Sequence, residues 1–168
     1  MVDLDSVFGD WMKVLDRDMM EKYRRMLMQT TLNGISICPD GGRVFHAFRA
    51  CDFNNLKVVV LGQDPYFDGN ATGLAFANDI FKEGFEDLSP SLKVIRDSVL
   101  SLVDSEEMPI FDPSLESWAE QGILLLNSAL TVRTNHPGSH LEAWKPFIQK
   151  VLTGISAETN CCFLCLVK

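Results

Sequence analysis

The sequence predicts an α/β fold arranged in three layers (α/β/α), in which helices cover both faces of a short central parallel sheet. Three apolar runs have the length of strands: Val58–Leu61, Ile123–Leu126 and Cys161–Val167. They show no alternation of apolar and polar residues, which is typical of strands that are buried on both faces. Helical patterns separate the runs, and strands that alternate with helices favour parallel pairing.

The chain of 168 residues fits a single domain, 1–168, because no repeat, linker or low-complexity segment interrupts it. No apolar run reaches the ~18 residues that a membrane-spanning helix needs, so we expect no membrane partner. The acidic N-terminus, MVDLDSVFGDWM, is not typical of a secretory signal or a transit peptide. We therefore expect a cytoplasmic protein.

The chain is acidic, with a formal net charge of −8. Proteins that bind nucleic acid through the field of their whole surface are usually basic. The charge therefore indicates that the chain either does not bind nucleic acid or binds it through a local site.

The first predicted element is a helix capped by Ser6. Trp11, Val14 and Leu15 fall on one face of this helix, and helical spacing continues to about Leu27. A Pro-Asp-Gly-Gly turn then opens the segment 37–48, which leads towards the first strand.

Two helices are predicted between the first and second strands. Ser89 is the expected cap of the longer one, with Pro90 at its first helical position. Asp112-Pro113 opens a shorter helix in the same way, and Gly122 ends it. The apolar face of the longer helix is formed by Leu92, Val94, Ile95, Val99, Leu100 and Val103.

A last helix is expected between the second and third strands. Ser139 and Glu142 have the spacing of a capping box at its start. The apolar side chains that follow at helical spacing are Trp144, Phe147, Ile148 and Val151.

The five cysteines include a CxxC pair, Cys162 and Cys165. In metal and redox sites such a pair lies on a turn, whereas here it lies in an apolar run that is typical of a strand. Residues three apart on a strand point to opposite faces, so they could not share a metal ion. We expect buried core thiols and no metal site.

Polar residues follow two of the predicted strands directly. Gln63 and Asp64 come just after the first strand, and Asn127 ends the second. The carboxyl ends of parallel strands meet at one edge of a sheet, where ligands bind. These three side chains should therefore converge, and Tyr66 and Phe76 can reach the same crevice from the loop that follows the first strand.

This combination of side chains suits a planar heterocycle. An amide can read the hydrogen-bonding edge of such a ring while an aromatic side chain stacks on its face. A carboxylate can activate water or stabilise a cationic transition state. The set therefore indicates chemistry on a nucleobase and its sugar.

Each of these residues also has a purely structural interpretation. Asp64 could form an Asx turn before Pro65, and Asn127 could cap the helix that follows its strand. Phe76 could belong to the core, and Tyr66 could pack with a satisfied hydroxyl group. Their shared position at one sheet edge favours the functional interpretation.

Several of these segments resemble the main family of uracil-DNA glycosylases. GQDPYF, residues 62–67, is similar to the family's water-activating motif, which normally ends in His. GLAF, 73–76, looks like the segment with the uracil-stacking Phe, and LSPSL, 88–92, is similar to the Pro-Ser loop that contacts the DNA backbone. WAEQGILLLNSALTV, 118–132, is close to the motif with the uracil-reading Asn. The likeness covers almost the whole chain.

The resemblance implies an enzyme that flips deoxyuridine out of single- or double-stranded DNA and cleaves its N-glycosidic bond, without a cofactor. Asp64 would position the attacking water and stabilise the oxocarbenium-like sugar. Gln63 would bind the base through nearby backbone groups, and Tyr66 would stand against uracil C5, where a thymine methyl would clash. Phe76 would stack on the ring, and Asn127 would read its polar edge.

The resemblance also assigns the phosphates of DNA to Ser89 and Ser91. One departure from the family pattern is Phe67, which stands where the motif normally has His. The other is the end of the chain at Lys168, ahead of the family's last strand and its His-Pro-Ser-Pro segment. From these departures we expect a domain that is short at its C-terminus and lacks its last strand.

Two consequences are expected from the short C-terminus. The third strand would expose an apolar edge, through which the protein could associate with itself. Losing the His of the missing segment would weaken catalysis. The alternative to an active glycosylase is therefore a homologue that binds uracil or uracil-containing DNA without turnover.

Overall fold

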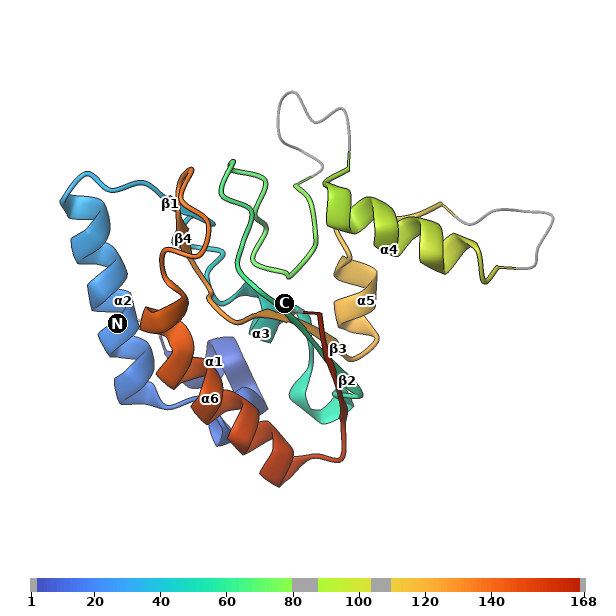
Figure 1. Cartoon of the computed structure of the whole chain (residues 1–168). Helices are drawn as coiled ribbons and strands as arrows, with labels where there is room; N and C mark the ends of the chain where they lie inside the picture. The colour runs from blue at the N-terminus through green and yellow to red at the C-terminus, as the bar shows by residue number, and fades with distance from the viewer. Residues whose placement is uncertain (1–2, 80–87, 104–109, 167–168) are drawn as a thin grey trace.

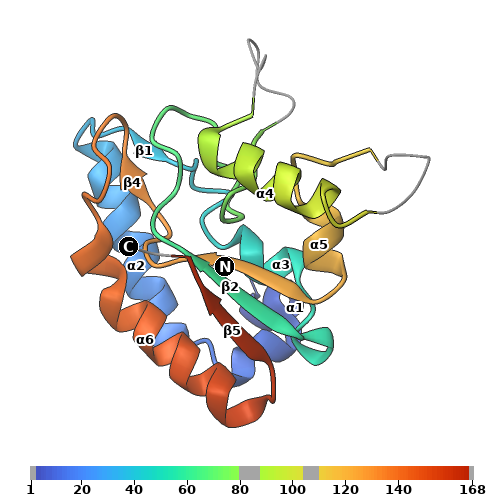
Figure 2. The same ribbon diagram turned by 45° about the vertical axis from the view of Figure 1, so that its right-hand side comes forward.

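The computed structural model describes residues 3–79, 88–103 and 110–166. Its central sheet has the strand order β3-β2-β5, formed by Ile123–Asn127, Val58–Gly62 and Cys162–Cys165. Both pairings are parallel, as predicted, and Val58 lies opposite Ile123 on one side and Cys162 on the other. The three strands lie side by side in Figures 1 and 2.

The helices surround this sheet, and two further strands form a small antiparallel ribbon beside it. In the described residues, no helix is long and apolar enough to cross a membrane. The ribbon is β1 (Ile37–Cys38) with β4 (Val132–Arg133), and the helices are α1 (Leu4–Phe8), α2 (Arg17–Leu32), α3 (His46–Ala50), α4 (Pro90–Leu100), α5 (Glu116–Glu120) and α6 (Leu141–Glu158), with 3-10 turns at Gly9–Lys13 and Phe53–Asn55.

Both faces of the central strands are covered. Val59 and Val60 point to opposite faces of β2, and both are buried. The same holds for consecutive leucines of β3, because Leu124 and Leu125 have exposed fractions of 0% and 1%. Helix α6 lies on one side of the sheet, and α3 and α5 lie on the other (Figure 2). The α/β fold class predicted from continuous apolar runs is confirmed.

The N-terminal prediction of one long helix capped by Ser6 is wrong. Helix α1 is capped by Asp3, whose carboxylate accepts a hydrogen bond from the Asp5 amide. Gly9, at φ +50°, then ends α1, and Asp16 caps the separate helix α2. The helical spacing continues across this break because apolar residues on both sides of it are buried, among them Trp11, Leu15 and Tyr23.

Two predictions about helix starts had different outcomes. Ser89 is the N-cap of α4 and Pro90 its first residue, as expected, but the Ser89 side chain makes no capping hydrogen bond. The capping box before α6 is wrong, because His140 occupies the N-cap. The Ser139 hydroxyl group instead accepts a hydrogen bond from the Arg133 amide at 2.9 Å, which fixes the loop after β4.

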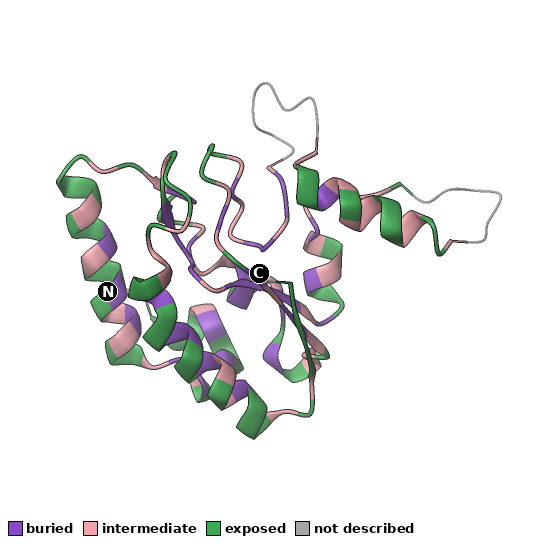
Figure 3. Ribbon diagram, in the orientation of Figure 1, coloured by how far each residue is buried: buried purple, intermediate pink, exposed green. Residues whose placement is uncertain are grey.

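Strand β5 and helix α4 are more exposed than their apolar sequences predict (Figure 3). Only Leu92 of α4 is buried, and all four residues of β5 are exposed. The expectation of buried thiols is therefore wrong for Cys162 and Cys165, although Cys38 and Cys51 are buried. The predicted last residue of this strand, Val167, lies outside the described residues.

Gly154→Ala is expected to destabilise the protein although Ala favours helices by about 1 kcal/mol. A Cβ at Gly154 in α6 would lie 2.9 Å from Val14 Cβ, closer than carbon atoms pack. Overpacking of this kind costs about 1–3 kcal/mol, which outweighs the helical preference. Urea denaturation measures the effect, and a double variant with Val14→Ala should recover most of the loss. A Gly154→Ala protein more stable than wild type would contradict the prediction.

Candidate active site

The loops that follow β2 and β3 leave the sheet at the same edge (Figure 1). Gly62 and Asn127, the last residues of the two strands, lie directly opposite each other in the parallel register. Beyond them, the Ser128 amide donates to the Gly62 carbonyl at 2.8 Å and the Ala129 amide to that of Gln63 at 3.0 Å. The pairing therefore continues past the strands and holds both loops in register.

A cavity of about 380 Å³ opens at this edge. It brings together the residues that the sequence assigned to the base and the sugar, and Ser91 as well. Ser89 is not among the lining residues. One lining residue, Leu166, was not predicted from the sequence. Its amide donates to the Leu61 carbonyl just beyond β5, and this places it at the cavity. The lining residues are Gln63, Asp64, Pro65, Tyr66, Phe67, Ala71, Leu74, Phe76, Ser91, Asn127 and Leu166.

Gly62 shows how closely two of these groups converge. A Cβ placed on Gly62 would lie 2.5 Å from Asn127 Oδ1 and 3.2 Å from Phe76 Cζ. Asn127 is buried, with an exposed fraction of 7%, and its amide makes no hydrogen bond with another described residue. Because this amide lines the cavity, its hydrogen-bonding capacity is available to a polar ligand there.

Phe76 stands in an uncommon backbone conformation. Its φ of +68° places it in the left-handed region, which a bulky residue adopts only when its surroundings enforce it. Here the Ala75 amide donates to the Leu125 carbonyl at 3.0 Å, so the loop is anchored to β3 immediately before Phe76. The strained residue thereby presents its ring to the cavity.

Asp64 is held by a distant loop. Its Oδ2 accepts a hydrogen bond from the Gly138 amide at 2.5 Å. Gly138 has a φ of +76°, which glycine adopts without strain, and this conformation lets the loop after β4 direct the amide at the carboxylate. The other carboxylate oxygen can accept a hydrogen bond from water or a ligand.

Tyr66 is fixed through its hydroxyl group. It donates to the Phe76 carbonyl at 3.2 Å and accepts a hydrogen bond from the Ser89 hydroxyl at 2.6 Å. Burial raises the pKa of Tyr66 above its ordinary value, an effect that the hydrogen bond from Ser89 partly offsets. The phenol therefore stays neutral at physiological pH.

The loop that carries Gly138 is anchored by a buried hydrogen-bond chain. Trp144 Nε1 donates to Thr131 Oγ1 at 2.8 Å, and the same oxygen lies 2.9 Å from His140 Nδ1. Burial lowers the pKa of His140, and the nearby Arg133 lowers it further. Neutral His140 is therefore the form that the folded loop favours.

Stability is expected to fall as the pH drops below about 6.5, the ordinary pKa of histidine. In this range the unfolded chain takes up a proton at His140 more readily than the folded chain. The loss of stability continues until the pH reaches the lowered pKa of His140 in the folded state. Urea midpoints measured at about pH 7.5 and about pH 5.5 test this. His140→Gln should reduce the difference between the two midpoints.

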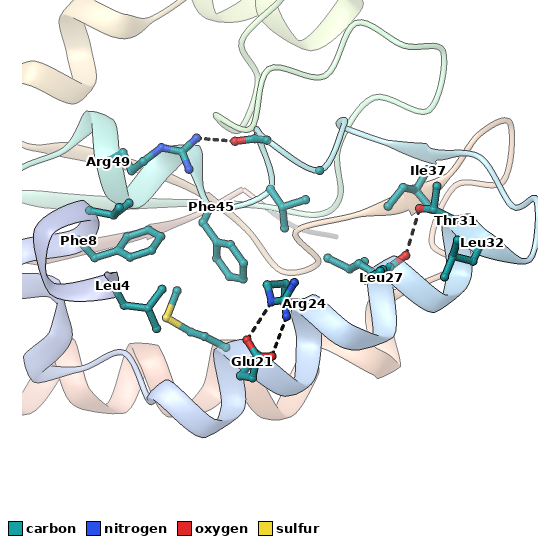
Figure 4. Close-up of a pocket in the computed structure, with 16 residues that line it drawn as sticks. Leu4, Phe8, Glu21, Arg24, Leu27, Thr31, Leu32, Ile37, Phe45 and Arg49 are labelled. Atoms are coloured by element: carbon teal, nitrogen blue, oxygen red, sulfur yellow. Dashed lines mark hydrogen bonds and ion pairs between the residues drawn. The ribbon is translucent and has the colours of Figure 1, made fainter. Parts of the chain in front are cut away.

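A cavity of about 590 Å³, larger than the one at the sheet edge, lies elsewhere, between α1, α2 and segment 37–49 (Figure 4). Its lining is mainly apolar. The Glu21 carboxylate accepts two hydrogen bonds of 2.8 Å from Arg24, and Arg49 donates to the Gly42 carbonyl. Its charged groups are thus already paired, which makes this cavity a poorer candidate for catalysis than the one at the sheet edge.

Histidine, cysteine and carboxylate side chains do not gather into a metal site within the described ranges, where no group of three or more could hold a metal ion. His46, for example, contacts Glu116 at 2.7 Å, away from the cavity at the sheet edge.

The fold and the cavity define a class of protein. A carboxylate, an open amide, a phenol and an aromatic ring surround a cavity at the carboxyl edge of a parallel sheet, as in α/β proteins that bind a small planar polar ligand. The chain belongs to the uracil-DNA glycosylase superfamily, whose family model matches residues 48–164. That match includes every lining residue except Leu166.

Curated relatives and a solved structure agree with this membership. The chain is 37% identical over 163 residues to a uracil-DNA glycosylase of Pseudoalteromonas translucida, covering 91% of this chain and 70% of the relative. It is 40% identical over 157 residues to one of Buchnera aphidicola, covering 89% and 68%. The crystal structure of mimivirus uracil-DNA glycosylase has the same fold, with a TM-score of 0.71 at 20% identity, and the chain covers 63% of its length.

Proposed function

We propose that this protein is a uracil-DNA glycosylase that hydrolyses the N-glycosidic bond of deoxyuridine in DNA and so initiates base excision repair. The observation that carries the proposal is the convergence of Asn127 Oδ1 and the Phe76 ring on one point beside the Gly62 backbone, in the cavity that Asp64 also lines. Family membership supports the same reaction.

Asp64 acts on the sugar in this proposal. Its carboxylate, oriented by the Gly138 amide, positions the water that attacks the anomeric carbon. As the bond to the base lengthens, the sugar develops positive charge, and the nearby carboxylate stabilises it. One hydrogen bond from the backbone leaves the second carboxylate oxygen for the water.

The base is recognised by four residues. Phe76 stacks on the ring, and the open amide of Asn127 binds its polar edge, where uracil and cytosine present opposite donors and acceptors. Tyr66 stands against C5 and excludes the methyl group of thymine. Gln63, whose side chain is exposed, contributes through neighbouring backbone groups.

We further propose that the DNA backbone binds beside α4, with Ser91 as a phosphate contact, in single- or double-stranded substrates. Ser89, which the resemblance also assigned to phosphate, instead gives its amide proton to Asn78 and its hydroxyl proton to Tyr66. Ser91 is exposed and lines the cavity. A local contact of this kind is what an acidic chain requires, because its net charge of −8 opposes broad attraction to DNA.

The alternative function, binding of uracil or uracil-containing DNA without excision, is favoured by one observation. Phe67 lines the cavity with 40% of its surface exposed, where the resembling motif normally has His. An apolar ring in the cavity that Asp64 lines can neither hydrogen-bond the attacking water nor relay a proton from it.

A gel assay with an oligonucleotide that contains one deoxyuridine separates the two functions. Excision leaves an abasic site that alkali cleaves, so a glycosylase yields a shorter strand, and an otherwise identical thymidine oligonucleotide is the control. Retention of the uracil strand without cleavage would support the binding function. A protein that neither cleaves nor binds the uracil strand would contradict both functions.

We also propose a cytoplasmic location and self-association through the β5 edge. Phe163 and Leu164 of this strand have exposed fractions of 45% and 50%, and β2 is its only neighbour in the described sheet. A second copy of the chain could pair with this edge. Sedimentation at increasing protein concentration tests the association, and Leu164→Lys should weaken it.

A further inference from the structure

A continuous hydrogen-bond chain connects the start of α4 to the base-binding residues. The Asn78 side chain accepts a hydrogen bond from the Ser89 amide at 2.8 Å, and the Ser89 hydroxyl group donates to Tyr66 Oη at 2.6 Å. Tyr66 Oη in turn donates to the Phe76 carbonyl at 3.2 Å. Asn78 is itself buried, with an exposed fraction of 1%, so the chain starts from a fixed point.

The direction of these bonds follows from the number of protons available. Tyr66 has one hydroxyl proton, which it gives to a carbonyl oxygen that can only accept. Ser89 must therefore be the donor in the bond between the two hydroxyl groups. Its amide proton is already given to Asn78, so both protons that Ser89 could offer to a phosphate are engaged within the protein.

The position of Ser89 in α4 points to the same role. A serine at a helix N-cap normally accepts a hydrogen bond from a backbone amide of the first turn, which stabilises the helix. Ser89 occupies the N-cap but makes no such bond. Its hydroxyl group is directed to Tyr66 instead.

We propose that Ser89 is a positioning residue that holds the Tyr66 ring in place and thereby sets the discrimination between uracil and pyrimidines with a larger group at C5. This inference rests on the proposed function. The phenol hydroxyl is clamped between Ser89 and the carbonyl of Phe76, so the ring against C5 and the ring that stacks on the base are fixed relative to each other. Without the Ser89 hydroxyl, Tyr66 can tilt and admit a methyl group.

Single-turnover excision from oligonucleotides with uracil, 5-bromouracil or thymine tests the proposal. Ser89→Ala should leave the uracil rate within about threefold of wild type and lower the preference for uracil over 5-bromouracil by roughly three- to tenfold, the range expected for one hydrogen bond. Ser89→Thr, which keeps the hydroxyl group, should restore the preference. Ser101→Ala is the matched control, because its exposed hydroxyl group at the far end of α4 donates only to the Ser98 carbonyl.

A phosphate contact predicts a different pattern. Loss of such a contact would raise KM by the same factor for every base and leave the preference unchanged. An unchanged preference in Ser89→Ala for both 5-bromouracil and thymine would therefore overturn the positioning role.

The ionisation of Tyr66 gives a readout that does not require activity. The hydrogen bond from Ser89 lowers the pKa of Tyr66, so Ser89→Ala should raise it in an ultraviolet absorbance titration. Tyr23→Phe in both proteins removes the signal of the second tyrosine. A raised pKa in a protein that excises no uracil would contradict the proposed function alone, whereas an unchanged pKa would contradict the contact itself.

Discussion

Asp64→Asn is expected to lower the single-turnover rate of uracil excision by about 10²–10⁴-fold, the range that a positioned acid–base group contributes. The amide keeps the size and shape of the side chain and can still accept the hydrogen bond from Gly138. It cannot take a proton from water, and it carries no charge to stabilise the cationic sugar. Binding of a uracil oligonucleotide should change much less than the rate.

A matched control is needed because removing a carboxylate also makes this acidic protein less repulsive to DNA. Asp18→Asn makes the same change of charge at an exposed position of α2, far from the cavity in sequence and outside its lining. It should leave the excision rate at the wild-type value. Equal residual cleavage by wild type and Asp64→Asn would end the enzymatic proposal for this chain and favour the binding function.

The sequence predicted the sheet and the convergence of polar residues at one of its edges, for a clear physical reason. Continuous apolar runs identify strands buried on both faces, and parallel pairing brings their carboxyl ends to one edge. Gly62 and Asn127 are opposite each other in the observed register, so Gln63 and Asp64 follow β2 at the place where β3 ends. Residues far apart in the chain could therefore be assigned to one cavity.

Contacts made by individual hydrogen bonds could not be predicted in this way. The Gly138 amide reaches Asp64 because of a loop conformation at φ +76°, and no periodic pattern records it. The Ser89 hydroxyl group matched the pattern of a helix cap and yet binds Tyr66. A cap and a tertiary contact require the same residue type, so the sequence alone does not distinguish them.

Burial was predicted less well where an element lies at the margin of the fold. Cys162 and Cys165 belong to an apolar run, but β5 has only β2 beside it in the described sheet and remains exposed. An apolar run indicates that a strand can be covered, whereas its actual burial depends on which elements pack against it.

Gly62→Ala is expected to reduce kcat/KM for uracil excision by about 10²-fold, because small displacements in an active site have effects of this size. The added Cβ would lie 2.5 Å from Asn127 Oδ1, a distance that forces the amide to move, and 3.2 Å from Phe76 Cζ. The φ of Gly62 lies outside the left-handed region, so Ala can adopt the backbone conformation of β2. The substitution should therefore impair base recognition without destabilising the strand.

Gly41→Ala is the matched control, since a Cβ there would have no heavy atom within 4 Å, and it should retain wild-type activity. A double variant tests the cause of the Gly62 effect. If the clash acts through the displaced amide, Gly62→Ala should add little to the loss already produced by Asn127→Ala, because the two changes disable the same contact. Fully additive losses in a protein that remains folded would mean that Gly62 matters for another reason and that Asn127 does not read the base from its position beside the Gly62 backbone.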